Sequence, residues 1–87
     1  SDLFLASGAV INFNAGNATI THSAGNLAVN VPLGLQGYTV AGLPAAGTAG
    51  RMAYVTDALA PAFLAVVVGG GAVVTPVFDN GAAWVAV

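Results

Sequence analysis

The clearest structural signal in the chain is the stretch AVINFNAGNATITHSAGNLAVNV, residues 9–31. Apolar and polar residues alternate with a period of two in three short runs, residues 9–13, 18–22 and 27–31. The runs are separated by NAGN (14–17) and SAGN (23–26), whose Asn and Gly residues suit tight turns. This pattern predicts a β-meander of three antiparallel strands. The spacing of the two turns, nine residues, also indicates a short internal repeat.

The last third of the chain is again typical of β-structure. The sequence predicts one strand in RMAYVT (51–56), a hairpin of FLAVVV (63–68) with AVVTPVF (72–78), and a final strand at 82–87. Asp79-Asn80-Gly81 predicts a type I′ or bulged turn. Pro76 is expected at a sheet edge or in a bulge, because proline has no N–H to donate.

Between these regions the sequence loses its periodicity. Residues 32–50 are rich in Gly, Pro and Ala, and they predict a connector with one short strand near 38–40. Helix is disfavoured throughout, since Pro61 limits the best candidate, residues 56–65, to about one turn. We therefore expect an all-β chain of short antiparallel strands and hairpins, in three parts. These are a β-meander with a shaft-like repeat (1–37), a Gly/Pro/Ala-rich connector (38–50) and a C-terminal β module (51–87).

The composition points to self-association. Of the 87 residues, 57% are hydrophobic and 5% are charged, against a usual charged share of about 25%. A domain of this size buries only about 60–65% of its unfolded surface. Much of the apolar surface must then lie at interfaces, so we expect an obligate oligomer. The chain begins at Ser1 without Met, and we expect a piece of a longer polypeptide.

Several function classes are disfavoured by composition. The absence of cysteine excludes disulfides and thiol chemistry, and one Arg with a net charge of −2 excludes an electrostatic nucleic-acid footprint. Residues 58–78 are uncharged and long enough to cross a bilayer, but Pro, Gly and β-branched residues favour two strands over a spanning helix. We expect no membrane insertion. Aggregation of Val-rich runs is a further alternative, which the regular turns argue against.

The scarce charges single out three residues. Arg51 and Asp57 share one predicted strand but lie about 20 Å apart along it, so they cannot pair with each other. Asp79 is the best partner for Arg51, across the sheet or from a neighbouring chain; a solvated Arg51 and a ligand contact are the alternatives. Asp57 is expected to cap a turn. If Arg51 pairs at an interface, Arg51→Ala weakens assembly.

Other residues have structural interpretations. Tyr54 and Trp84 are expected to anchor the core, with a carbohydrate platform as the alternative, and Tyr38 and Asn80 are candidate exposed contact residues. His22 is expected at the edge of the core; a metal site there would need several copies around an axis. No nucleophile elbow is present, there is no Glu, and the Asp residues are scattered. We therefore expect no enzyme activity, catalytic residue, cofactor or metal.

The C-terminal half carries a family resemblance. The run LPAAGTAGRMAYVTDA (43–58), a glycine-rich hairpin and PVFDNGAAW (76–84) together resemble a module common near the C-termini of bacteriophage tail-fibre and other virion fibre proteins. The matching positions are Gly50, Ala53, Tyr54, Val55, Asp57, Gly69, Gly70, Gly71, Pro76, Val77, Phe78, Asp79, Gly81 and Trp84. Residues 11–29 are similar to the short β repeats that precede this module. The present chain is more apolar than the family pattern.

The resemblance implies a β-rich structural component of a phage virion, an intertwined homotrimer in a tail or head fibre or spike. Its expected partners are copies of itself, other virion proteins and a host surface receptor. Three such chains could wind their sheets about one axis, which would cover strand edges and bring apolar faces together. A bacterial surface adhesin and a receptor-binding tip that recognises a host glycan are the alternatives.

Overall fold

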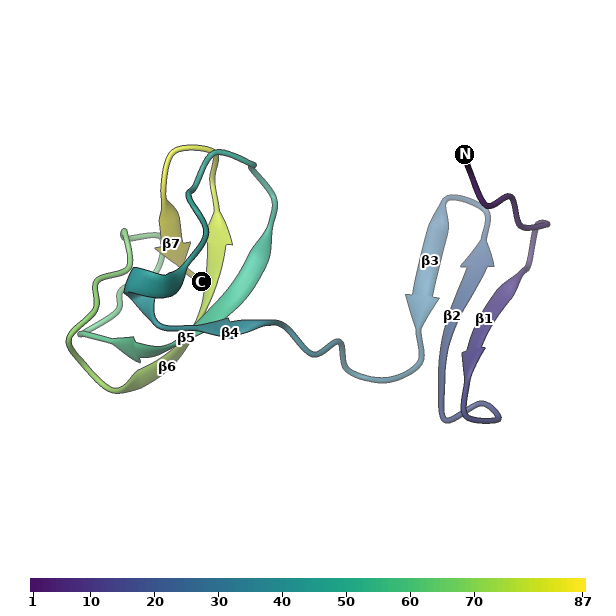
Figure 1. Cartoon of the computed structure of the whole chain (residues 1–87), viewed down its shortest axis with the longest axis horizontal. Coiled ribbons are helices and arrows are strands. Elements are labelled where there is room, and N and C mark those ends of the chain that lie inside the picture. Colours follow the sequence, from purple (N-terminus) through teal and green to yellow (C-terminus); the bar gives the residue numbers. More distant parts are fainter. The chain divides into compact units, whose positions relative to one another are not determined.

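The computed structural model describes all 87 residues, and its strands form two β-sheets without an α-helix (Figure 1). The all-β prediction is confirmed. The chain divides into two compact units, Ser1–Gly34 (unit 1) and Leu35–Val87 (unit 2), each with one sheet. The only helical element is one 3-10 turn, η1 (Val40–Gly42). No helix has the length and apolar character of a membrane span.

Unit 1 is the predicted β-meander. Its strands β1 (Val10–Phe13), β2 (Ala18–Ser23) and β3 (Asn26–Val29) pair antiparallel in the order β1-β2-β3. Positive φ angles at Asn14, Ala15 and Gly16 form the first turn, and Gly25 has a positive φ in the second. The alternation and turn chemistry therefore located all three strands.

The register of unit 1 separates two faces. Ile20 lies opposite both Ile11 and Val29, and directly opposed residues share a face. We call one side the apolar face: Ile11, Phe13, Ala18, Ile20, His22, Leu27 and Val29. The other side is the polar face: Val10, Asn12, Thr19, Thr21, Ser23, Asn26 and Ala28. No residue of unit 1 is buried.

Unit 2 has a four-stranded sheet in the order β4-β5-β6-β7. The strands are β4 (Gly37–Tyr38), β5 (Met52–Ala58), β6 (Val73–Asp79) and β7 (Trp84–Ala86). The β4–β5 pair is parallel and the other pairs are antiparallel, so the expectation of antiparallel strands alone is wrong for β4. The core consists of Ala53, Val55, Ala58, Val67, Val77 and Trp84.

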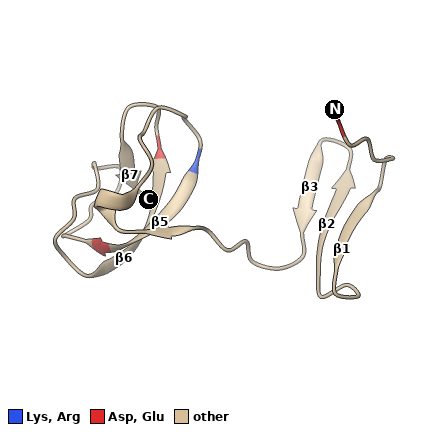
Figure 2. Ribbon diagram, viewed as in Figure 1, with Lys and Arg blue, Asp and Glu red and all other residues tan.

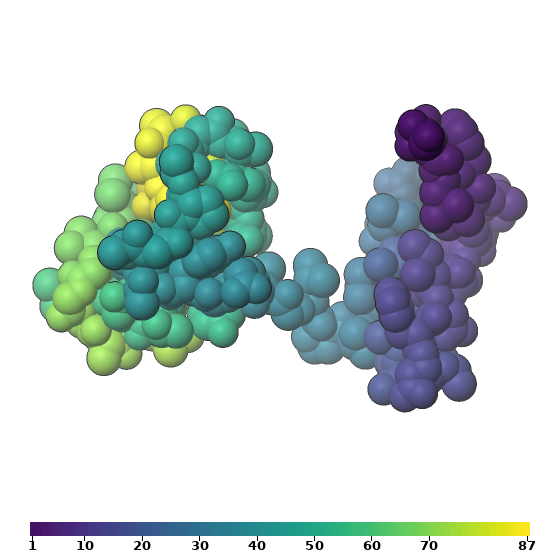
Figure 3. Space-filling model, in the orientation of Figure 1, coloured from purple at the N-terminus to yellow at the C-terminus, as the bar shows by residue number.

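Residues 38–50, which the sequence set apart as a connector, lie within unit 2. Tyr38, Val40, Leu43 and Ala46 pack against the core of the sheet. In the space-filling view the teal atoms of this segment lie against the green and yellow atoms of the later residues (Figure 3). We call residues 38–50 the cover segment, because they pack over the core of unit 2.

The predicted strand at 63–68 is wrong. Residues 62–65 form a turn, Leu64 has a φ of +64°, and only Val66 makes a bridge, to Val85. The segment runs beside β7, where the Val67 N–H donates to the Trp84 carbonyl. Since β5 and β7 occupy both edges of β6, the predicted hairpin of 63–68 with 72–78 has no free edge to form.

Pro76 is not on an edge strand, because β6 lies inside the sheet. It faces Tyr54, whose N–H donates to the Gln36 carbonyl on the β4 side, so this pair needs no N–H from Pro76. On the other side Pro76 lies beyond the end of β7, where its carbonyl accepts from the Val87 N–H. Pro76 has no N–H to return to Val87, and the regular β6–β7 pairing ends one residue earlier, at Val77 and Ala86.

Candidate functional site

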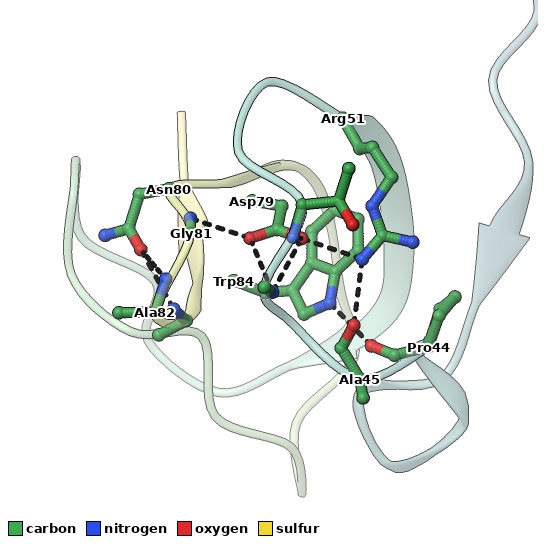
Figure 4. A network of polar contacts seen from close by, with 11 residues as sticks. Pro44, Ala45, Arg51, Asp79, Asn80, Gly81, Ala82 and Trp84 are labelled. Atoms are coloured by element: carbon green, nitrogen blue, oxygen red, sulfur yellow. Dashed lines mark hydrogen bonds and ion pairs between the residues drawn. The ribbon is translucent and has the colours of Figure 1, made fainter.

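The most elaborate polar site centres on Asp79, the last residue of β6. Its side chain is 0% exposed and accepts hydrogen bonds from four residues (Figure 4). The Arg51 Nη2 lies 2.7 Å from Oδ2, with the Thr48 N–H at 3.0 Å from the same oxygen. The Gly81 N–H is 2.8 Å from Oδ1, and the Gly47 N–H lies 3.2 Å from both oxygens. We call this arrangement the Asp79 network.

The backbone around Asp79 explains how Arg51 reaches it. The Gly50 N–H donates to the Asp79 carbonyl (2.8 Å), and the Asp79 N–H donates to the Arg51 carbonyl (2.9 Å). Gly50 and Arg51 on one strand thus lie opposite the single residue Asp79 on the other. This is the pattern of a G1 β-bulge, whose first residue is a glycine of positive φ. Gly50 has a φ of +99°. The bulge starts β5 and places the Arg51 side chain beside the carboxylate.

Arg51 makes two further contacts. The same Nη2 donates to the Ala45 carbonyl at 2.8 Å, and the guanidinium carbon lies 5.1 Å from the centroid of the Trp84 ring. At this distance a cation is attracted by the ring face. The ion pair expected for Arg51 therefore forms within one chain, with the arginine partly exposed and Asp79 buried.

The two aromatic residues predicted to anchor the core have different positions. Trp84 is buried in the core, and its Nε1 donates to the Pro44 carbonyl at 2.8 Å, which fixes the cover segment. Tyr54 is half-buried, and its ring lies against Gly37, where a Cβ would come within 2.5 Å of it. A buried Trp84 presents no open ring face as a carbohydrate platform.

The pKa of Asp79 reflects opposing effects. Burial raises it, but the hydrogen bond from Arg51, followed by those from Gly81, Gly47 and Thr48, lowers the pKa from 3.8 to about 2. The carboxylate is therefore ionised at neutral pH, with its charge balanced by Arg51.

Asp57 accepts a hydrogen bond at the distant turn η1, and not at the turn that follows it in the sequence, where it was expected to act as a cap. Its Oδ1 accepts the Val40 N–H at 2.8 Å, at the first residue of η1. A register shift between Val55 and Ala58 interrupts the β5–β6 pairing at this point, so Asp57 leaves the regular alternation that it shares with Arg51 in the sequence. The two residues do not pair with each other.

The two candidate contact residues behave differently. Tyr38 lies in β4, opposite Val55, and is half-buried against the core, so only part of its side chain is exposed. Asn80 is exposed, but its Oδ1 accepts the N–H groups of Ala82 and Ala83, both at 2.9 Å. Only Gly81 in this loop has a positive φ, so the turn is not type I′.

His22 lies on the apolar face of unit 1. Its Nδ1 accepts the Gly8 N–H at 3.1 Å, so the neutral ring carries its proton on Nε2. The ring borders an apolar hollow lined by Leu3, Leu5, Ala6, Ala9, Ile11, Ile20, His22 and Leu27. No three metal-ligating side chains come together in the structure.

Sequence reasoning missed the donors that hold Asp79. Gly47 and Thr48 contribute through backbone N–H groups, which every residue except proline has. The available signal was the GTAG run at 47–50, since its glycines permit the positive φ angles seen at Gly47 and Gly50.

Neither a protein-family model, nor a curated protein sequence, nor a solved structure matches this chain.

Proposed function

We propose that this chain is a non-enzymatic structural domain of a bacteriophage fibre or spike, and that it functions as a homotrimer. The observation that carries the proposal is the absence of any buried residue in unit 1, although its three strands are fully paired. A sheet with one hydrophobic face must bury that face against another element to form a stable layer. Neighbouring copies of the chain would supply that element.

Unit 2 adds a second surface of the same kind. A run of large apolar residues is exposed along residues 59–74, namely Leu59, Phe63, Leu64, Val66, Val68, Val73 and Val74. The charges of this unit are already engaged, because Arg51 pairs with Asp79 and Asp57 caps η1. The remaining surface therefore favours apolar association, which supports an obligate assembly.

The virion assignment rests on the resemblance to fibre modules. Several positions that carry it also build the Asp79 network: Gly50 forms the bulge, Gly81 donates to Asp79, and Trp84 lies beneath Arg51. These motif positions stabilise one region of unit 2, and this supports a role of the module as a rigid part of a fibre. Contact with a host receptor would then fall to exposed loops such as residues 80–83.

Two experiments test the proposal. Native mass spectrometry of the purified chain at low micromolar concentration should give three times the chain mass, and a single-chain mass would overturn the assembly. Peptides of this chain should occur in purified virus particles produced from the genome that encodes it. Their presence only in a bacterial surface or matrix fraction would favour the adhesin instead.

A further inference from the structure

We infer that the apolar face of unit 1 is the surface through which copies of this chain meet, with the polar face turned to solvent. The inference rests on the proposed homotrimer and adds to it which side of which sheet forms the interface. The occupant of the face is therefore a second copy of the same sheet.

The two faces of the sheet differ in chemistry. The apolar face has one polar side chain, His22, and its Nδ1 is already bonded to the Gly8 N–H. On the polar face the Asn12 side chain accepts the Gly16 N–H at 2.6 Å, and just after β3 the Asn30 side chain accepts the Thr19 N–H at 2.8 Å. The polar face also has Thr19, Thr21, Ser23 and Asn26, so most of the hydrogen-bonding side chains of the sheet lie on that side.

Much of the apolar face is exposed, although Leu3, Leu5, Ala6 and Ala9 lie beside it around the hollow and Ile20 and His22 are half-buried. Leu27 is 70% exposed, Phe13 55% and Ile11 42%. An antiparallel sheet normally packs its apolar face on a second layer and leaves the polar face to water. Unit 1 has the alternation of such a sheet, but within the single chain its second layer is incomplete.

Charge favours an identical copy as the missing layer. No charged side chain occurs from residue 3 to residue 50, and Asp2 is the only charged side chain in unit 1 (Figure 2). Two apolar faces of this kind can approach without like-charge repulsion, and the face offers nothing to recruit a charged partner. An identical sheet also matches the length and width of the surface to be covered.

The face also has room for a side chain from a neighbour. The hollow beside His22 has a volume of ≈ 210 Å³ and is walled by leucine and isoleucine side chains. An apolar cavity of about 150 Å³ is enough to hold a benzene ring. The chain exposes phenylalanines of matching chemistry at Phe4 and Phe13.

The absence of cysteine makes a direct test possible with the full chain. Val29→Cys places a thiol on the apolar face, and Ala28→Cys places one on the polar face of the same strand. Both parent residues are exposed in the single chain. In the assembled protein we expect a charged alkylating reagent to modify the thiol of Val29→Cys at least about tenfold more slowly than the thiol of Ala28→Cys. Reaction at residue 29 then requires local opening of the interface.

A second pair of variants tests the same face through the mass of the assembly. Ile20→Gln should dissociate the trimer, and its neighbour Thr21→Gln should leave the trimer intact. Fluorescence of Trp84, the only tryptophan, reports whether unit 2 stays folded in each variant.

The outcomes separate this inference from the proposed function. A trimer in which Val29→Cys reacts as fast as Ala28→Cys overturns the assignment of the face and leaves the homotrimer standing. A monomeric parent chain overturns both. A monomer in which Val29→Cys is nonetheless protected means that another part of the same chain covers the face, and this also overturns the inference.

Discussion

Asp79 shows how a chain with very few charges uses one of them. An isolated buried carboxylate is strongly unfavourable, and it persists only when paired and hydrogen-bonded. Here both oxygens are occupied by three backbone N–H groups and by Arg51. The network joins β6, the loop after it and the cover segment, so this single side chain connects parts of unit 2 that are distant in the sequence.

Substitution of Asp79 should therefore destabilise unit 2. Asp79→Asn removes the charge that balances Arg51 and turns an amide NH₂ toward backbone donors that need an acceptor. We expect a clear fall in the midpoint of urea unfolding, followed by Trp84 fluorescence. Asp2→Asn is the matched control: this exposed residue should leave the midpoint unchanged. Equal midpoints for the Asp79 variant and the parent chain would contradict a stabilising role of the network.

The same carboxylate predicts acid sensitivity. Its pKa is about 2 in the folded chain, against an ordinary value of 3.8, so the unfolded chain binds the proton more readily. The stabilisation is complete above the ordinary value and is lost as the pH falls from 3.8 toward 2. Unfolding midpoints measured from pH 5 to pH 2 should decline in that window for the parent chain. The unfolding midpoint of Asp79→Asn should depend less steeply on pH in this window. The same dependence in both proteins would show that Asp79 is not the group responsible.

At the level of elements, the junction of β5 and β6 depends on the bulge at Gly50. A residue with a Cβ is strained at a φ of +99°, so Gly50→Ala should cost about 1–2 kcal/mol of unfolding free energy. Gly34→Ala is the control, because Gly34 has no positive φ and no atom near its Cβ position. Urea unfolding compares the two variants. A loss for Gly50→Ala no greater than that for Gly34→Ala would mean that the bulge is readily rearranged.

The elements that the sequence located are those specified locally. Alternation between Asn/Gly turns found β1, β2 and β3, β5 followed from the same period, and β6 followed from a Val-rich run before a turn. The valine run at 63–68 has the composition of a strand, yet its place is decided by the turn at Leu64 and by the partners already beside β6. The parallel β4 has only two residues, too few for a period.

In the candidate site, too, the sequence predicted some contacts and not others. Scarcity of charge made Asp79 the natural partner of Arg51, and the sequence supported that pairing without choosing between one chain and two. The contacts of Gly47, Thr48 and Pro44 are made by backbone groups, which carry no residue signature. Their positions follow only from the folding of the cover segment onto the core.

At the scale of the whole molecule, the two units have unequal means of stability. Unit 2 has a buried core and the Asp79 network, whereas unit 1 has paired strands and no buried residue. A sheet whose missing layer comes from other copies is stabilised by mass action, which dilution weakens. The folding of unit 1 should therefore depend on protein concentration much more than that of unit 2.

Hydrogen exchange measured peptide by peptide on the full chain tests this difference. In the concentration range where the trimer is the main species, we expect the apparent stability of β1 to β3 to fall by about 1 kcal/mol with each tenfold dilution, since a tenfold change in concentration is worth 1.4 kcal/mol per association step and a trimer makes two such steps for three chains. Peptides of β5 and β6 serve as the internal control, because their amides are held by contacts within one chain. Exchange of β1 to β3 that is slow and independent of concentration would show that unit 1 is stable without other copies, and the argument for obligate assembly would fail.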